Sequence, residues 1–127
     1  MNTKYKIVLA VVAGAAFGGA TVHGLRAQVN PKAYLITENE VIDPDAQKTY
    51  GALALTAQKA AGGRNFGTGG GKIVAFAGDP PKRVAITEWD SLDALLAFRN
   101  GKAWHDLVPQ RDKAVKIPRS YAVEATR

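Results

Sequence analysis

Two glutamates and two arginines are the residues of this sequence that could carry chemistry together. Glu38 and Glu88 each occur in a stretch with the alternation of a β-strand. Two carboxylates held close together raise the pKa of one of them, which makes an acid/base pair. Arg64 and Arg111 could hold a carboxylate-bearing ligand through bidentate hydrogen bonds, with aspartates of the same chain as alternative partners. We favour a simpler alternative for the acids, structural ion pairs with Arg64, Arg83 or Arg111.

The amino-acid composition excludes several kinds of catalytic and metal site. The sequence contains no Cys, which excludes disulfides, thiolate zinc sites, iron–sulfur clusters and cysteine nucleophiles. His23 lies in the N-terminal segment described below, so His105 alone cannot build a multi-His metal centre. A Ser–His–Asp triad would need His105 to serve Ser91 or Ser120, and no Gly-x-Ser-x-Gly motif occurs. We therefore expect no metal and no cofactor, and a surface position for His105.

Residues 1–27 have the layout of a secretory signal peptide. Lys4 and Lys6 give a positive start, residues 7–22 carry no charge, and Ala27 is a small residue suited to cleavage. The uncharged run is shorter than the roughly 20 residues of a membrane-spanning helix. We therefore expect cleavage near Ala27 and a periplasmic or secreted domain of residues 28–127. The alternative is a retained anchor in the inner membrane, and only then is a membrane partner expected.

The net charge does not favour a nucleic-acid partner. The whole sequence carries +6, but removal of residues 1–27 leaves 14 basic against 11 acidic residues, a net charge of +3. The main basic cluster, at 111–119, is interrupted by Asp112, which is typical of a solvated face and not of a phosphate-binding surface.

The first part of the domain predicts a strand followed by a helix. Residues 32–42 alternate as a strand does, with polar and apolar side chains on both faces. Asp43 and Pro44 then supply an N-cap and a proline at the first helical position. Gly62 and Gly63 end the helix. Its apolar stripe is expected to contain Ala46, Tyr50, Leu53, Ala57 and Ala61.

A triple glycine, Gly69-Gly70-Gly71, follows the helix. It lacks the Gly-Lys-Ser/Thr ending of a phosphate loop, so we interpret it as a bulge or bend in one edge strand. The two halves of that strand are expected at residues 64–68 and 72–77. The short turn at 78–81 then requires antiparallel pairing with a strand at 83–89.

The second part of the domain repeats the strand and helix. Asp90 or Ser91 is expected to cap a helix that ends near residue 100, and Pro109 opens a last short helix over 110–115. Residues 117–124 form the final strand, at an edge because of Pro118. The inward side chains of the longer helix are expected to be Leu92, Leu95, Leu96 and Phe98.

The predicted order, β–α–β–β–α–β, is that of a ferredoxin-like α+β fold. Right-handed crossovers place both helices on one face of a four-stranded antiparallel sheet and leave the other face bare. A bare face that carries apolar residues favours a homodimer. Glu38 and Glu88 then lie on adjacent strands, and each could face the side covered by helices.

Several segments of the chain occur in the order known from one bacterial family: residues 32–36, 43–44, 62–64, 71–74, 81–92 and 109–111. Over about residues 32–125 the sequence resembles domain-of-unknown-function family 1330 (DUF1330), of the dimeric α/β-barrel superfamily. The resemblance implies the fold and the dimer but no reaction, because function does not follow from fold. Arg64 and Arg111 match recurrent arginines of that family. Haem-binding relatives in the superfamily use a helix His, but neighbouring charges make His105 a poor counterpart.

Three functions remain open from the sequence. The first is a homodimer that binds a small organic ligand in the cleft between helices and sheet, with Arg64, Arg111 and His105 as candidate ligand contacts. The second is a cofactor-free monooxygenase-like or isomerase-like enzyme, with Glu38 or Glu88 as base and the two arginines as anion clamp. The third is a structural or stress-related dimer without a ligand.

Overall fold

The computed structural model describes residues 30–127; the predicted signal peptide lies outside the described residues. The order of elements confirms the predicted βαββαβ arrangement, and two short helices follow the second long one, the later of them close to the short helix predicted over 110–115. The elements are β1 (Ala33–Val41), α2 (Pro44–Ala60), β2 (Arg64–Asn65), β3 (Arg83–Trp89), α3 (Leu92–Arg99), α4 (Lys102–His105), α5 (Val108–Ala114) and β4 (Val115–Glu124).

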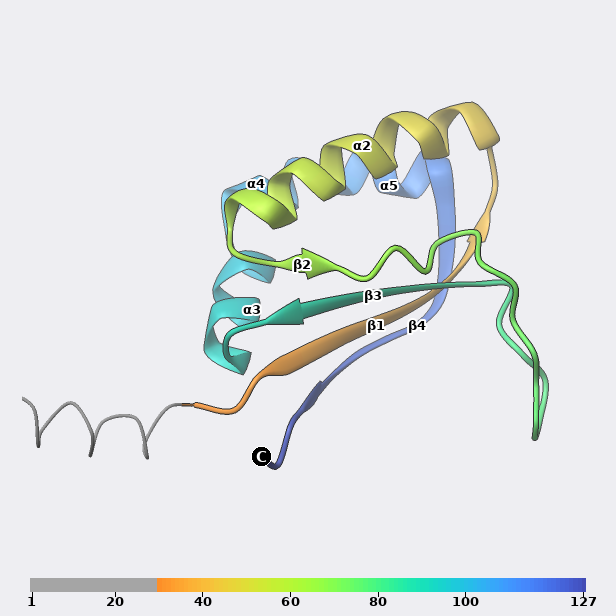
Figure 1. The fold of residues 1–127 in the computed structure, drawn as a ribbon. Helices are drawn as coiled ribbons and strands as arrows, with labels where there is room; N and C mark the ends of the chain where they lie inside the picture. The colour runs from red at the N-terminus through yellow and green to blue at the C-terminus, as the bar shows by residue number, and fades with distance from the viewer. Residues whose placement is uncertain (1–29) are drawn as a thin grey trace, which may run out of the picture. The chain divides into compact units, whose positions relative to one another are not determined.

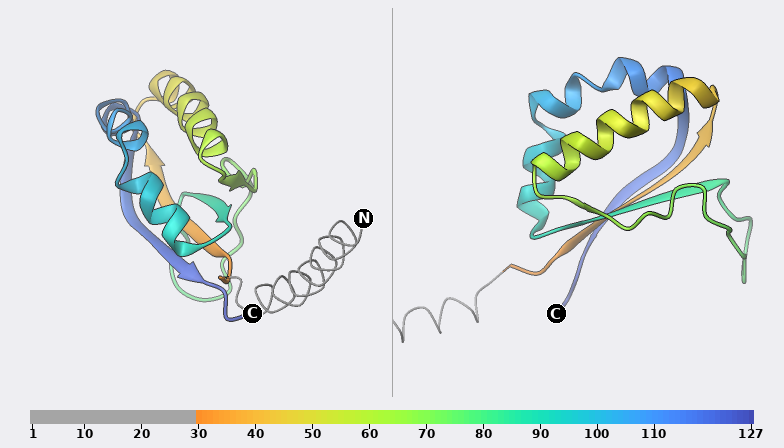
Figure 2. Two further views of the ribbon diagram at one scale, coloured as in Figure 1. Left: turned by 90° about the vertical axis from the view of Figure 1, so that its left-hand side faces the viewer. Right: turned by 45° about the horizontal axis from the view of Figure 1, so that its top comes forward.

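The four strands form one antiparallel sheet in the order β2-β3-β1-β4. The helices lie along one side of it, as Figures 1 and 2 show. This confirms the predicted α+β, ferredoxin-like fold. β4 is an edge strand, so the missing N–H of Pro118 is tolerated there. Among residues 30–127, none of the helices combines the length and the apolar character needed to cross a membrane.

Both long helices begin where their capping residues predict. Asp43 has an extended backbone, and its Oδ1 accepts hydrogen bonds from the N–H groups of Asp45 (3.0 Å) and Ala46 (3.2 Å). Ser91 caps α3 by accepting from the N–H of Ala94 at 3.0 Å. Each cap satisfies N–H groups that the first turn of a helix leaves without an internal partner. Of the two caps predicted for α3, Ser91 is therefore the one used.

The core lies between the sheet and the helices. Trp89 of β3 is completely buried, and its ring stacks on Phe98 of α3 with centroids 5.1 Å apart. Phe98 in turn meets the edge of Trp104, at 5.9 Å. The remaining buried members of this cluster are Leu35, Ala54, Leu95 and Leu107.

Three apolar side chains predicted to point inward are in fact exposed: Leu53, Leu96 and Ala61, which lies just beyond the end of α2. Leu53 of α2 is 42% exposed, and Ala54 occupies the core in its place. Leu96 of α3 is also largely exposed, whereas Leu95 is buried. The reason is that each helix turns about 100° per residue, so neighbouring apolar positions cannot all reach one sheet face.

The prediction of a second half of the edge strand, at residues 72–77, is wrong. Residues 72–77 form no strand: the chain after β2 first runs beside β3 and then forms a loop that leads away from the sheet (Figure 1). Residues 64–68 already occupy the free edge of β3: after β2, the N–H of Phe66 donates to the carbonyl of Ile86 and the Thr68 hydroxyl donates to that of Val84. Because β1 takes the other edge of β3, residues 72–77 have no strand edge to join. Phe76, in this loop, is 97% exposed.

The register decides which strand residues share a face. Leu35 lies opposite Thr87, and both are buried toward the helices. Tyr34 lies opposite Glu88 on one side and Val123 on the other, and Ile36 lies opposite Ile86 and Tyr121. Since successive residues of a strand alternate between faces, these residues belong to the face away from the helices. Within residues 30–127, no helix covers that face. We call it the open face.

Candidate functional site

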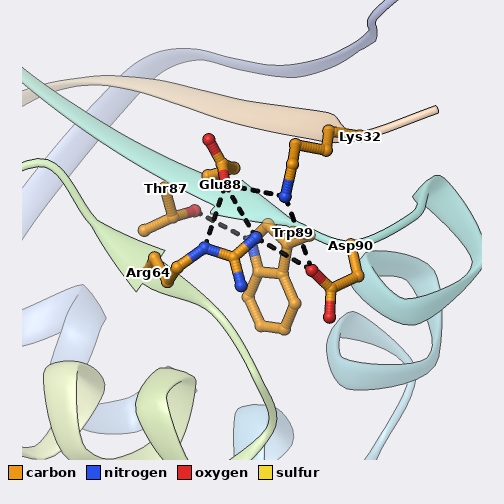
Figure 3. A network of polar contacts seen from close by, with 6 residues as sticks. All are labelled: Lys32, Arg64, Thr87, Glu88, Trp89 and Asp90. Carbon is orange, nitrogen blue, oxygen red and sulfur yellow. Dashed lines mark hydrogen bonds and ion pairs between the residues drawn. The ribbon is translucent and has the colours of Figure 1, made fainter.

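Glu88 belongs to a network of charged side chains at the end of β3 (Figure 3). Its Oε1 accepts from Arg64 Nε at 2.9 Å, and Arg64 Nη2 lies 2.9 Å from Asp90 Oδ1. Lys32 Nζ adds a contact of 3.2 Å to Glu88. The hydrogen bonds from Arg64, followed by those from Lys32, lower the pKa of Glu88, and Arg64 likewise lowers the pKa of Asp90. A carboxylate with a lowered pKa is held charged and makes a weak general base, so the ion-pair alternative fits Glu88 better.

Glu38 lies on the same face as Glu88 but far from it along the sheet. Its partner in β3 is Val84, whereas the partner of Glu88 is Tyr34. Four strand residues separate the two positions, which corresponds to about 13 Å. Glu38 instead accepts from Arg119 Nη2 at 2.8 Å. The structure therefore places both glutamates on the open face, in separate ion pairs, and not together beneath the helices.

The other candidate ligand contacts are also dispersed. Arg64 is bound to the acids at the end of β3. Arg111 of α5 donates to Asp112 Oδ1 through Nε and Nη2, at 3.1 and 3.0 Å. His105 is exposed on α4. The described residues include no group of three or more His, Asp or Glu side chains placed to hold a metal ion.

A cleft lies between α2 and the helix-covered face of the sheet, where sequence reasoning placed the ligand. Its volume is about 290 Å³. One wall comes from Gln47, Tyr50 and Ala54 of α2, and the floor comes from Leu35, Thr37 and Asn39 of β1. The other lining residues are Gly51, Leu55, Gln58, Asn65, Gly67, Gly69, Arg83, Ala85, Arg99, Trp104, Val115 and Ile117.

Two amide side chains in this cleft have buried atoms without a partner. Asn39 is only 7% exposed, and neither its Oδ1 nor Oε1 of Gln47 makes a hydrogen bond within the described structure. A buried polar atom without a partner costs about 1–3 kcal/mol, so such atoms are uncommon in folded proteins. Tyr50 of α2 lies near Arg99 and Arg111. Burial raises the pKa of its phenol, which keeps the hydroxyl neutral.

One protein-family model matches nearly all of the residues that the structure describes. The model of the family described as Domain of unknown function (DUF1330) matches residues 32–126. The chain belongs to the DUF1330 family. The matched region contains every residue that lines the cleft. None of the curated proteins matches the chain.

Solved structures support the same fold for this DUF1330 domain. A protein of unknown function from Rhodopseudomonas palustris, RPA0582, is 16% identical over 82% of this chain and 93% of its own, with a TM-score of 0.56. Its methylated form is 17% identical over 82% and 91%, with a TM-score of 0.59. SnoaB, a cofactor-independent oxygenase from Streptomyces nogalater, is 11% identical over 76% and 95%, with a TM-score of 0.57. At these identities the likeness establishes the fold.

Sequence reasoning about this DUF1330 chain missed the residues that line the cleft. Asn39 was assigned only to a strand face with mixed character, Tyr50 was assigned only to the apolar stripe of the first helix, and Gln47 and Arg99 were given no role. One signal was present, because Arg99 follows Phe98 at the end of an otherwise apolar helix stretch. That signal could not show that the arginine turns toward α2, since this depends on how the helices cross the sheet.

Proposed function

We propose that this protein is an exported homodimer that binds a small organic ligand in the cleft between α2 and the sheet. The observation that carries the proposal is the pair of buried amides, Asn39 and Gln47, with atoms that lack partners in the cleft lining. Both oxygens are closed to solvent in this structure, so a ligand with polar groups would supply the missing hydrogen bonds once the amides turn toward the cleft, and would then remove their cost.

The character of the cleft suits a small molecule with an apolar body. Its volume lies near the lower end of the roughly 300–1,000 Å³ typical of ligand pockets. Leu35, Ala54 and Trp104 give it an apolar wall, while the amides provide a few fixed polar contacts. Mostly apolar walls with few convergent polar groups are the usual composition of a ligand site.

The enzyme alternative receives less support from the geometry. Its proposed bases, Glu38 and Glu88, do not line the cleft, and each is bound to an arginine. Its proposed anion clamp, Arg64 with Arg111, is divided between the end of β3 and helix α5. The likeness to SnoaB concerns the fold, so it does not supply a reaction for this chain.

Filling the cleft tests the binding function. Leu55→Trp places an indole ring at a cleft-lining position that is 48% exposed, whereas Leu53→Trp makes the same change on α2 outside the lining. In a thermal-shift screen of small acids, quinones, haem and flavins, we expect compounds that raise the Tm of the wild type and of Leu53→Trp. Their effect should be lost in Leu55→Trp, because a ligand stabilises only the state that binds it. If no compound raises the wild-type Tm, the ligand-free structural dimer gains support instead.

The dimer is proposed through the open face. Tyr34 and Phe66 pack there with ring centroids 6.1 Å apart, beside Ile36 and the half-exposed Tyr121 and Val123. These apolar side chains share the open face with the ion pairs Glu88–Arg64 and Glu38–Arg119, and exposed apolar area on a sheet is more typical of an interface than of a solvated face. In a C2 dimer the same face of both copies would be covered.

A charge on the open face is expected to break the dimer. Tyr121→Asp puts a carboxylate among apolar side chains, which is costly to bury. Light scattering at micromolar concentration should give a dimer mass for the wild type and a monomer mass for this variant. Leu96→Asp, at a similarly exposed position of α3, is the control and should remain dimeric. A monomeric wild type would contradict the proposal.

Export is proposed from the layout of residues 1–27. We expect the protein recovered from the periplasm of a bacterial host to have the mass of residues 28–127, as measured by intact mass spectrometry. The sequence predicts cleavage after Ala27 because this small residue follows the uncharged segment. A full-length mass in the membrane fraction would instead indicate a retained anchor.

A further inference from the structure

The cleft carries positive charge that is not balanced by its own lining. Arg83 of β3 and Arg99 at the end of α3 both line it, and of the described lining residues none is Asp or Glu. Apart from these two arginines, the residues that line the cleft are uncharged. A concave site with one sign of charge attracts ligands of the opposite sign.

These two arginines differ from three others in the domain. Arg64, Arg111 and Arg119 each have a carboxylate oxygen within 3.0 Å. Within residues 30–127, neither Arg83 nor Arg99 forms an ion pair with a carboxylate. Withdrawing a guanidinium partly from water costs free energy unless a negative charge pairs with it. A negatively charged ligand in the cleft would offset this cost for Arg83 and Arg99.

Arg99 is fixed in place by its neighbours. Its guanidinium carbon lies 4.3 Å from the centroid of the Trp104 ring, a cation–π contact that leaves the N–H edge of the group available for hydrogen bonds. Burial, followed by the charge of Arg111, lowers the pKa of Arg99. Arg111 itself lies 5.7 Å from the same ring, so two cations flank one indole. A negative charge near Arg99 would relieve this repulsion.

Arg83 lies directly against Gly69, the first residue of the triple glycine. A Cβ on Gly69 would lie 2.7 Å from Nη2 of Arg83, closer than a Cβ comes to an atom it is not bonded to, so the end of the arginine would have to shift. The glycine therefore lets the connection after β2 lie directly against the guanidinium. This gives Gly69 a role that neither a phosphate loop nor a strand bulge provides.

We propose that the ligand of the cleft is a small organic acid, with an apolar body against Leu35 and Trp104 and its carboxylate held by Arg83 or Arg99. This inference rests on the proposed binding function and names the class of ligand. Arginine pairs with carboxylate through two parallel hydrogen bonds, and the apolar lining favours an organic acid over inorganic phosphate. The buried amides of Asn39 and Gln47 would contact the polar groups that remain.

Matched pairs of acids and amides test this inference. The probes are benzoate with benzamide, hexanoate with hexanamide, and inorganic phosphate, each titrated by calorimetry and thermal shift at neutral pH and low salt. We expect the carboxylates to bind at least about tenfold more tightly than their amides, because hydrogen bonds to charged groups contribute more than neutral ones. Phosphate should bind more weakly than either acid.

Four variants test which arginine binds the carboxylate of the ligand. Arg83→Gln and Arg99→Gln should each be compared with Lys59→Gln, which makes the same change in net charge at an exposed position of α2 outside the cleft. Loss of about tenfold or more in benzoate affinity is expected for at least one of the two arginine variants and not for the lysine variant. If Arg83→Gln loses affinity, Gly69→Ala should also weaken benzoate binding without changing the net charge, because its methyl group displaces Arg83.

The outcomes separate the two proposals. Equal binding of acid and amide, unchanged in both arginine variants, overturns the organic-acid inference and leaves the binding function standing. Phosphate binding as tight as that of benzoate also overturns it, because the apolar body then contributes nothing. If neither the acids nor the amides bind the wild type, the organic-acid inference fails, and the binding function fails with it only if the quinones, haem and flavins of the thermal-shift screen also leave the Tm unchanged.

Discussion

Trp89→Ala is expected to lower the free energy of unfolding by about 3–5 kcal/mol. Trp89 is 0% exposed, its ring stacks on Phe98, and its Nε1 donates a hydrogen bond of 2.9 Å to the Thr87 hydroxyl. Truncation removes the buried ring, leaves a cavity between sheet and helices, and deprives Thr87 of its partner. A loss of this size is a large part of the roughly 5–15 kcal/mol that stabilises a typical domain.

Urea unfolding at fixed protein concentration would measure this effect, since dimerisation makes stability depend on concentration. The control is Phe76→Ala, which removes an aromatic ring that is 97% exposed and should change the stability by less than about 0.5 kcal/mol. If Trp89→Ala does not fold, Trp89→Phe keeps a ring in the same layer and should lose less. Equal effects of Trp89→Ala and Phe76→Ala would contradict the assignment of the core.

Gly63→Ala is expected to destabilise the protein by about 1–3 kcal/mol, although it adds only one methyl group. A Cβ at Gly63 would lie 2.6 Å from Cζ2 and 2.9 Å from Cη2 of Trp89. The indole cannot move away, because it is buried and held against Phe98. The cause is close packing and not backbone conformation, since positive φ angles in this turn belong to Gly62 and not to Gly63.

Two comparisons make the prediction specific to Trp89. Gly51→Ala lies within α2, where the added Cβ meets only the flexible end of Gln47 at 3.4 Å, so it should stabilise the protein by about 0.4–1 kcal/mol. Combining Gly63→Ala with Trp89→Phe should cost less than the sum of the two single changes, because the smaller ring relieves the overlap. Both are measured by chemical denaturation. Additive effects would show that the methyl group and the indole do not collide.

Features that depend on a few consecutive residues could be predicted from the sequence. The Asp43-Pro44 start of α2, the Ser91 cap of α3 and the edge position of Pro118 all follow from local backbone chemistry, and the structure has each of them. The order of strands and helices followed from these signals and from the alternation within strands. The pairing of Glu88 with Arg64 was among the alternatives considered.

The residues at 72–77 do not by themselves show whether they form a strand. Residues 72–77 have a composition suited to a strand, but a strand needs a free edge to pair with. Whether the edge of β3 is free depends on where residues 64–68 run, which lies outside the segment itself. The same limit applied to Leu53 and Leu96, because only the position of the sheet decides which side of a helix is covered.

The ferredoxin-like order of elements and the residue types available for a site follow from the amino-acid sequence. Which of those residues meet depends on tertiary packing. Glu38 and Glu88 were separated by the register of β1 against β3, a relation between residues far apart in the chain. Arg83 and Arg99 were brought to one cleft by the crossover of helices over the sheet. Caps and alternation act over a few residues, whereas a site is assembled by long-range packing, and this is why the fold was predictable and the site was not.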